Sequence, residues 1–366
     1  MTVVALDAMG GDHAPKSVVH GALLAARDAG LEVVLVGRIG ELRAHLPVTP
    51  ANVHLQEAPD AIGMAEQPTL SLRQKPRSSI MVGLDLVARG EAAAFASFGN
   101  TGAIMAASLF KLGRVPGVAR PALGTLFQNS RGSHTLLLDV GANVNCRPAY
   151  LLQFATMGKA YFERVLHHRN PSVGLLNVGE EESKGNQFTL EAYALLKRLE
   201  PNFTGNVEGD QMVGGAADIV VTDGFNGNIA VKVSEGVANL LTAQLKRVIK
   251  RKWHYVAGAW LLRGAFDTFR DHVDYQRVGG APLFGVNGPV IIGHGRADAE
   301  AVASGVRLAR AVGESKFVAA TRAAFSGTLP PHDDADHIPA SADESPALGA
   351  ESIVTRSTGS RLSQRP

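Results

Sequence analysis

The stretch VVALDAMGGDHAP, residues 3–15, decides the fold class of this chain, because an apolar run ends abruptly in a polar, glycine-rich loop. Val3 to Leu6 have the length and composition of a buried strand, which Asp7 ends. Pro15 then precedes a helical pattern that begins near Lys16. The order strand, glycine loop, helix is typical of open parallel sheets, in which ligands bind beyond the carboxyl ends of the strands.

The same alternation continues along the chain. Strands are predicted at 31–37, 53–56, 92–97, 123–127, 135–139, 173–178, 218–223 and 290–293, in addition to 3–7. Helices are predicted between most of them, including 16–29, 101–112, 149–168 and 187–200. Because the strands read as nearly continuous Val, Leu and Ile, we expect an α/β fold with a mostly parallel sheet covered by helices on both faces.

Composition narrows the class of protein. The chain has 366 residues, of which 45% are hydrophobic, and a net charge of +2. It has a single cysteine, Cys146, no secretion signal pattern, and no apolar run of membrane-spanning length, so we expect a cytoplasmic protein. Bulky apolar residues become sparse after Ser326. We therefore expect one folded catalytic domain over 1–326 and a disordered tail over 327–366.

Glycine-rich loops follow six of the predicted strands. They are DAMGGDH (7–13), SFGNTG (97–102), DVGAN (139–143), NVGE (177–180), TDGFNGN (222–228) and GHG (293–295). Glycine lets backbone N–H groups turn toward a ligand, and two of these loops open predicted helices whose dipoles favour anions. The sequence has neither a dinucleotide-binding nor a P-loop motif, so a small phosphate-like anion fits best, although ordinary βα turns have a similar composition.

Six motifs together resemble a bacterial enzyme family. DAMGGDHAP, SFGNTGAIM, LLLDVGANV, LLNVGEEESKGN, DIVVTDGFNGNIAVK and GGAPLFGVNGPVIIGHG occur in the order found in the phosphate acyltransferases of phospholipid synthesis. The resemblance extends from about Val3 to Phe325 and implies a three-layer α/β/α sandwich related to isocitrate and isopropylmalate dehydrogenases and to phosphotransacetylases. It also implies transfer of a fatty acyl group from acyl-acyl carrier protein to inorganic phosphate, giving acyl phosphate and free carrier protein.

The resemblance further implies the setting of the reaction. Members of the family are homodimers attached peripherally to the membrane, and their acyl phosphate serves a membrane acyltransferase that acylates glycerol 3-phosphate. We expect the same partners here, with no cofactor and no metal ion.

Two residues are predicted to be catalytic. His13 has an ordinary pKa of about 6.5 and suits proton transfer to or from phosphate or the leaving sulfur. Lys184, in the segment EEESKGN, carries a compact charge suited to phosphate or to the oxyanion of the transition state. A hydrogen-bonded loop histidine and a solvated lysine are the alternative interpretations.

Other loop residues are predicted to bind or to position the substrates. The phosphate and substrate ligands are expected among Gly10, Gly11, Asn100, Thr101, Gly102, Asn143, Asn186, Asn226, Asn228 and His294. Carboxylates that faced phosphate would repel it, so orienting roles are predicted for Asp7, Asp12, Asp139 and Asp223. An acyl-enzyme on Cys146 is a rival mechanism, although a lone cysteine is more often buried and inert.

The segment QLKRVIKRKWHYVAGAWLLR, residues 244–263, combines six basic residues with both tryptophans and has no acid. We predict a helical hairpin over about 244–275 that contacts an anionic membrane surface. The expected contact residues are Lys250, Arg251, Lys252, Trp253, Trp260 and Leu261. Docking of the acidic carrier protein and packing in a dimer are alternatives, and a nucleic-acid site is not expected.

Three other functions remain open at this stage. A phosphotransacetylase-like enzyme would use acyl-coenzyme A, which needs room for a nucleotide. A dehydrogenase of the related fold would need a nicotinamide site and carboxylates around a divalent metal, for which Asp7, Asp139 and Asp223 are the candidates. A membrane-surface scaffold without activity would leave the glycine loops unexplained.

Overall fold

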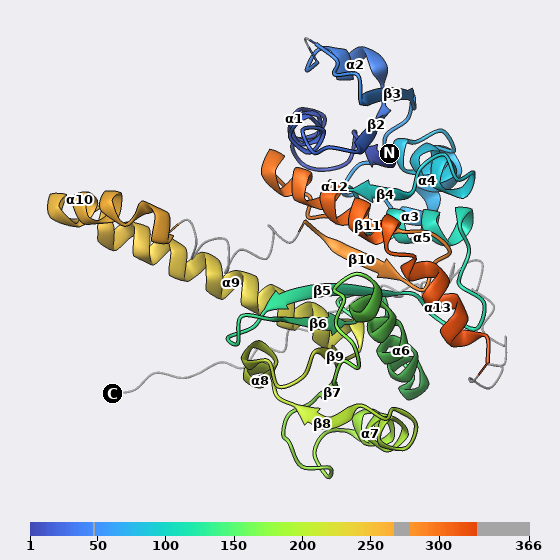
Figure 1. Ribbon diagram of the computed structural model, residues 1–366, viewed down its shortest axis with the longest axis vertical. Helices are drawn as coiled ribbons and strands as arrows, with labels where there is room; N and C mark the ends of the chain where they lie inside the picture. Colours follow the sequence, from blue (N-terminus) through green and yellow to red (C-terminus); the bar gives the residue numbers. More distant parts are fainter. Residues whose placement is uncertain (47, 267–278, 328–366) are drawn as a thin grey trace, which may run out of the picture. The chain divides into compact units, whose positions relative to one another are not determined.

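The computed structural model describes residues 1–46, 48–266 and 279–327. The predicted tail lies outside this part of the chain except for Gly327, and so do residues 267–275 of the predicted hairpin. The described residues form an α/β fold around an eleven-stranded sheet (Figure 1).

The strands and helices follow the predicted alternation. The strands are β1 Thr2–Asp7, β2 Leu31–Gly37, β3 Val53–Glu57, β4 Ala94–Ser97, β5 Ala122–Gln128, β6 His134–Leu138, β7 Val173–Leu176, β8 Phe203–Val207, β9 Ile219–Val221, β10 Ala281–Phe284 and β11 Val290–Ile292. The helices are α1 Lys16–Ala25, α2 Ile39–Arg43, α3 Pro68–Gln74, α4 Ser79–Ala88, α5 Thr101–Lys111, α6 Pro148–Arg164, α7 Gln187–Leu199, α8 Gly209–Gly214, α9 Gly224–Ile249, α10 Trp253–Leu261, α12 Ala299–Glu314 and α13 Phe317–Phe325. The nine predicted strands are all present, with ends shifted by a residue or two, whereas β8 and β10 were not predicted.

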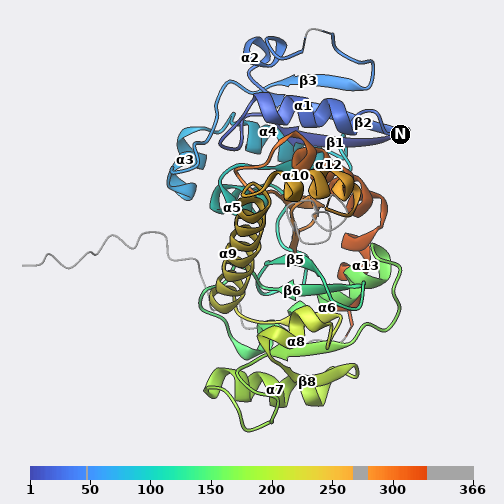
Figure 2. The ribbon, with the colours of Figure 1, turned by 90° about the vertical axis from the view of Figure 1, so that its left-hand side faces the viewer.

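Alternating side chains build an apolar core on each face of the sheet. In β1, Val4 and Leu6 join a cluster with α1, α12, α6 and α13, whereas Ala5 joins a second cluster with α4, α5, α8 and the start of α9. In β6, Leu136 and Leu138 likewise separate from Leu137. This period of two is what a strand buried on both faces requires. The predicted three-layer α/β/α sandwich is confirmed (Figure 2).

The sheet has the order β3-β2-β1-β4-β11-β10-β5-β6-β9-β7-β8. Neighbouring strands are parallel except at β11–β10, β10–β5 and β5–β6. These three reversals leave β6, β9, β7 and β8 antiparallel to β1, β4 and β11. The glycine loops therefore do not share one edge of the sheet: the loops after β1, β4 and β11 lie at one edge, and those after β6, β7 and β9 lie at the opposite edge.

Helix α9 connects the two halves of the sheet. It begins at the end of β9, and its first turns pack on the second apolar cluster through Ala230 and Val231. Its later turns and α10 extend away from the sheet as a helical hairpin (Figure 1), and none of the side chains of α10 is buried. The hairpin thus begins earlier than predicted, because α9 is continuous from Gly224 to Ile249.

Candidate functional site

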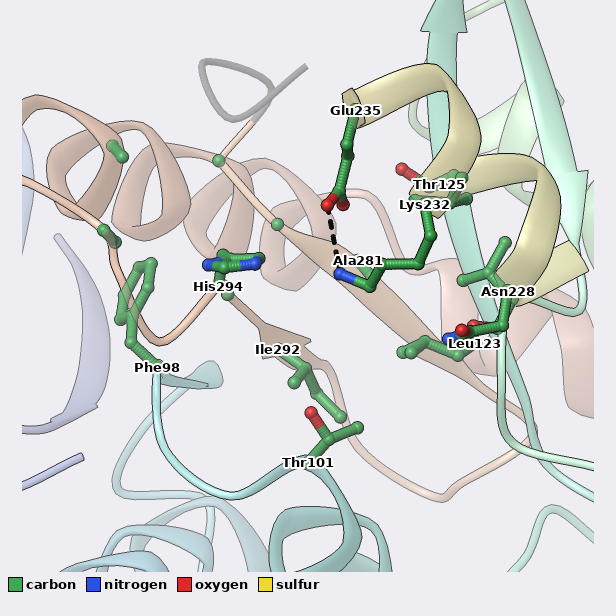
Figure 3. A pocket seen from close by; sticks show the side chains of 17 residues that line it. Phe98, Thr101, Leu123, Thr125, Asn228, Lys232, Glu235, Ala281, Ile292 and His294 are labelled. Carbon is green, nitrogen blue, oxygen red and sulfur yellow. Dashed lines mark hydrogen bonds and ion pairs between the residues drawn. The ribbon is translucent and has the colours of Figure 1, made fainter. Parts of the chain in front are cut away.

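A pocket of about 140 Å³ lies between the end of β11 and the first turns of α9 (Figure 3). Buried apolar side chains from β5, β11 and the loop after β4 form much of its wall, including Leu123, Ile292 and Phe98. The polar part of its lining comprises Thr101, Thr125, Asn228, Lys232, Glu235 and His294. The pocket therefore places charged and hydrogen-bonding groups beside an apolar wall.

The loops after β1, β4 and β11 contact one another at the His294 end of the pocket. The backbone N–H of Asp12 donates to the carbonyl of Gly295 at 2.7 Å. A Cβ at Gly10 would come within 2.8 Å of the backbone nitrogen of Gly99, so the two loops approach as closely as they do only because residue 10 is glycine. Parallel neighbours β1, β4 and β11 end at the same edge, which explains this contact.

Asp7 is buried beneath these loops. Its carboxylate accepts hydrogen bonds from Ser97 Oγ at 2.6 Å and from the Met9 backbone N–H at 3.0 Å. Burial raises the pKa of this carboxyl above its usual range, while the hydrogen bonds from serine hydroxyls and backbone amides act in the opposite direction. These contacts fix the first loop to β4.

Asp139 organises the other side of the pocket. Its carboxylate accepts hydrogen bonds from the backbone N–H groups of four residues, Leu123, Gly141, Ala142 and Asn143, at 2.7–3.2 Å. Helix α9 packs directly on the loop that Asp139 organises, because a Cβ at Gly227 would come within 1.8 Å of the Asp139 carbonyl oxygen. Asn228 Nδ2 then donates to the Val140 carbonyl at 3.2 Å.

The charged groups of the pocket converge from α9 and the end of β11. Lys232 Nζ lies 3.0 Å from Glu235 Oε2, and Figure 3 shows the His294 ring beside the space that the ammonium and carboxylate face. The Glu235 side chain is 15% exposed and the Lys232 side chain 54%. Lys232 keeps two further N–H donors for a ligand, since an ammonium has three.

His294 is held as a hydrogen-bond donor. Its Nδ1 accepts from the Arg296 backbone N–H at 3.2 Å, which in the neutral ring places the proton on Nε2. Burial lowers the pKa of His294, and the positive charge of Lys232 lowers it further, against weaker opposing effects of Glu235 and Asp12. At neutral pH the ring is therefore neutral, with an N–H to offer to an oxygen anion.

We expect the His294 ring to titrate below the usual histidine value of about 6.5. Lys232→Met should move the titration upward, because a nearby positive charge is lost, whereas Lys197→Met on α7 should not move it. NMR of the histidine rings in the full chain, recorded as a function of pH, measures the titration of His294 in the wild type and in both variants. A wild-type titration at or above the usual value would contradict the burial argument.

Three predicted ligands line this pocket: Thr101, Asn228 and His294. Four other predicted asparagine ligands do not line this pocket, and their side chains form hydrogen bonds within the chain. Asn100 Oδ1 caps α5 and its Nδ2 donates to the carbonyls of Met64 and Glu66, and Asn186 caps α7. The Nδ2 groups of Asn143 and Asn226 donate to the carboxylates of Asp139 and Asp223, respectively.

The two predicted catalytic residues lie in different places. His13 is exposed on the loop after β1, next to Asp12, whose backbone contacts Gly295. Lys184 is exposed on the loop after β7, 4.0 Å from Glu181 Oε2. Because β1 is third and β7 tenth in the sheet order, seven strand spacings separate them, about 34 Å in a flat sheet. One chain does not bring these two residues together.

Sequence reasoning missed Lys232 and Glu235. Both follow the predicted ligand Asn228 on α9, four and seven residues later, so the three side chains share one helix face. That spacing is visible in DGFNGNIAVKVSE and could have identified them.

Cys146 is poorly suited to act as a nucleophile. Burial and the charges of Asp139 and Asp223 raise the pKa of its thiol to about 12. The reactive thiolate is therefore a negligible fraction at neutral pH. Cys146 is also absent from the lining of the pocket.

Comparisons with known proteins agree on a family. The model of the family described as "Fatty acid synthesis protein" matches residues 2–320. The phosphate acyltransferase of Pelotomaculum thermopropionicum is 45% identical over 317 residues, covering 86% of this chain and 92% of the relative. The phosphate acyltransferase of Gloeobacter violaceus is 45% identical over 313 residues, covering 84% and 92%.

Solved structures with low sequence identity share the fold. A phosphotransacetylase from Streptococcus pyogenes superposes with a TM-score of 0.58 at 16% identity, covering 86% of this chain and 94% of that one. A branched-chain phosphotransacylase from Enterococcus faecalis gives a TM-score of 0.55 at 16% identity, covering 85% and 99%. The expected relation to the phosphotransacetylase fold is confirmed.

Proposed function

Because the chain belongs to the fatty acid synthesis protein family, whose relatives of known function are phosphate acyltransferases, we propose that this acyltransferase moves a fatty acyl group from acyl-acyl carrier protein to inorganic phosphate. The products are acyl phosphate and free carrier protein, and the acyl phosphate supplies phospholipid synthesis. The observation that carries the proposal is the pocket itself, where Lys232 and His294 face the same space beside an apolar wall.

Phosphate is proposed to bind between Lys232 and His294. The ammonium neutralises part of its charge, and His294 Nε2–H and the Thr101 hydroxyl donate to its oxygens. Asn228 lies one helical turn before Lys232 and adds another hydrogen-bonding group to the polar part of the pocket. The acyl chain lies along Leu123, Val231 and Ile292, which line the same pocket.

Phosphate attacks the thioester carbon directly in this proposal. One of its oxygens forms the new C–O bond, the carbonyl electrons move onto oxygen, and their return breaks the C–S bond. The proton that leaves with the sulfur comes from phosphate or solvent, so no strong base is needed. Hydrogen-bond donors held in place around the reacting groups stabilise the negative charge of the transition state. This stabilisation is the largest contribution that the protein makes to the rate in this proposal.

The choice of acyl donor decides between this proposal and an acyl-coenzyme A enzyme, which the phosphotransacetylase-like fold favours. We expect the full chain to release thiol from long-chain acyl-acyl carrier protein only when inorganic phosphate is present. Acyl phosphate is trapped with hydroxylamine and counted against the thiol. Release from acyl-coenzyme A alone would establish the alternative, and release without phosphate would overturn both.

His13 and Lys184 remain predicted catalytic residues outside the pocket lining. Measuring His13→Ala and Lys184→Ala in the same thiol-release assay tests whether either residue takes part in the reaction. Lys184 would have to act on a site other than the pocket of its own chain.

The hairpin is proposed to contact the membrane surface. No helix in the described part of the chain is both long and apolar enough to cross a bilayer. Trp253, Trp260 and Leu261 are 82%, 66% and 76% exposed on α10, which begins directly after the basic run Lys250–Lys252. Exposed aromatic and basic residues on one helical arm suit the interface of an anionic bilayer.

Replacing Lys250, Arg251 and Lys252 by Gln should weaken binding to vesicles that contain anionic lipid by roughly 100-fold, since the three interfacial charges contribute about 1 kcal/mol each. Flotation of the protein with vesicles measures it. Lys197→Gln with Arg198→Gln on α7 is the matched control and should bind as the wild type does. Unchanged flotation with a raised KM for the acyl carrier protein would instead assign the basic run to the carrier.

A second copy of the chain is proposed to cover the apolar stripe of α9. The stripe lies opposite the pocket face of the helix and is 40–62% exposed along its length, at Ile229, Val233, Val237, Leu240, Leu241, Leu245 and Val248. So long an apolar face is typical of an interface. The homodimer is read directly by sedimentation equilibrium, and the membrane acyltransferase that consumes acyl phosphate remains the expected downstream partner.

A further inference from the structure

Glu235 is out of place in a pocket for an anion. Its carboxylate points into the space shared by Lys232 and His294 (Figure 3), and its side chain is only 15% exposed. The ion pair with Lys232 explains part of this arrangement. It does not explain why a negative charge is kept where a negatively charged substrate is proposed to bind, since carboxylate and phosphate repel each other.

The carboxylate of Glu235 favours a ligand that also carries a proton. It faces the pocket, with Lys232 Nζ 3.0 Å away. An ionised carboxylate only accepts hydrogen bonds. A ligand oxygen next to it must therefore carry a hydrogen atom that it can donate in a hydrogen bond. Otherwise, two acceptor oxygens would face each other with no hydrogen atom between them.

Inorganic phosphate meets this condition and sulfate does not. Near neutral pH phosphate keeps at least one proton, so one oxygen is a P–OH donor while the others accept from Lys232 and His294. Arsenate has the same shape and also keeps a proton. Sulfate is fully ionised, so all four of its oxygens are acceptors.

We propose that Glu235 is a specificity-determining residue, which accepts a hydrogen bond from the protonated oxygen of phosphate and so excludes fully ionised tetrahedral anions. This inference rests on the proposed function, because it assumes that phosphate binds in this pocket. It adds that the ligand is recognised as a protonated oxyanion, whose protonated oxygen faces Glu235.

The test is equilibrium binding without an acyl donor. Calorimetry of the full chain with phosphate, arsenate and sulfate, at pH 7 and constant ionic strength, is compared between the wild type and Glu235→Gln. The glutamine has the same shape and an N–H donor in place of the negative charge. Glu91→Gln is the matched control, because Glu91 forms an exposed ion pair with Arg89 away from the pocket.

We expect the wild type and Glu91→Gln to bind phosphate and arsenate at least 10- to 100-fold more tightly than sulfate, because a site built to accept a hydrogen bond rejects a ligand that cannot donate it. Glu235→Gln should bind sulfate about as tightly as phosphate. Should this variant fail to fold, Glu235→Ala serves the same comparison.

Equal binding of sulfate and phosphate by the wild type, or an unchanged preference in the Glu235 variants, would overturn this inference while leaving the proposed function intact. No binding of phosphate or arsenate by the wild type, together with no phosphate-dependent thiol release, would overturn the proposed function, and this inference with it.

Discussion

Lys232→Met lowers kcat/KM for phosphate-dependent thiol release by about 10²- to 10³-fold, the usual loss when one fixed group that stabilises transition-state charge is removed. Lys232 is the cation that faces the space beside the His294 ring, with two N–H donors left after its pairing with Glu235. Methionine keeps most of the side-chain volume and removes the charge, so the loss reports electrostatics. The assay follows thiol and acyl phosphate at several phosphate concentrations.

Two variants make this result specific. Lys197→Met removes an exposed lysine that pairs with Glu182 on the opposite half of the sheet, and it should keep wild-type kcat/KM. Lys184→Met tests the lysine that the sequence motif singled out. If Lys184→Met loses activity and Lys232→Met does not, the phosphate site lies at the end of β7 and not in the pocket beside α9.

Gly227→Ala destabilises the protein by about 3 kcal/mol and abolishes the activity. The added Cβ would lie 1.8 Å from the carbonyl oxygen of Asp139, a backbone atom that the five hydrogen bonds accepted by the Asp139 side chain hold in place. Helix α9 must shift to relieve the clash, and Asn228, Lys232 and Glu235 move with it. For a chain of 366 residues, with an unfolding entropy of about 2.1 cal/mol/K per residue, the loss corresponds to a fall in Tm of roughly 4 °C.

Gly236→Ala is the control on the same helix. Nothing lies within 4 Å of a Cβ at residue 236, and alanine is the better helix former, so this variant should gain about 0.5–1 kcal/mol and keep its activity. Thermal unfolding of both variants by circular dichroism measures the difference. Equal Tm values for the two would mean that α9 does not depend on close packing against the loop after β6.

Much of the fold was predictable because its signals are local. The run from Val3 to Asp7 has the apolar continuity of a strand buried on both faces, and Pro15 precedes the helix that begins at Lys16. Strands β8 and β10 were missed because Phe203–Val207 contains Gly205 and Asn206, and Ala281–Phe284 contains Pro282, residues that are rare in strands.

The site was predictable only in part. His294 was found because it lies in a glycine loop at a strand end, and Asn228 because it lies in the loop that opens α9. Lys232 looked like an ordinary helical lysine, since nothing local says that its helix passes the end of β11. Lys184 had the stronger local signal, yet its loop lies on the far half of the sheet.

By itself the sequence determined the alternation of strands and helices, the glycine loops and the membership of a family of acyltransferases, because burial pattern, turn chemistry and motif order are all properties of neighbouring residues. Only the tertiary structure decided which loops meet. Three antiparallel pairings in the middle of the sheet turn its two halves in opposite directions, and α9 then carries Lys232 and Glu235 from one half to His294 in the other. Which strands pair depends on contacts between segments that are far apart in the sequence, and therefore on the packing of the whole core.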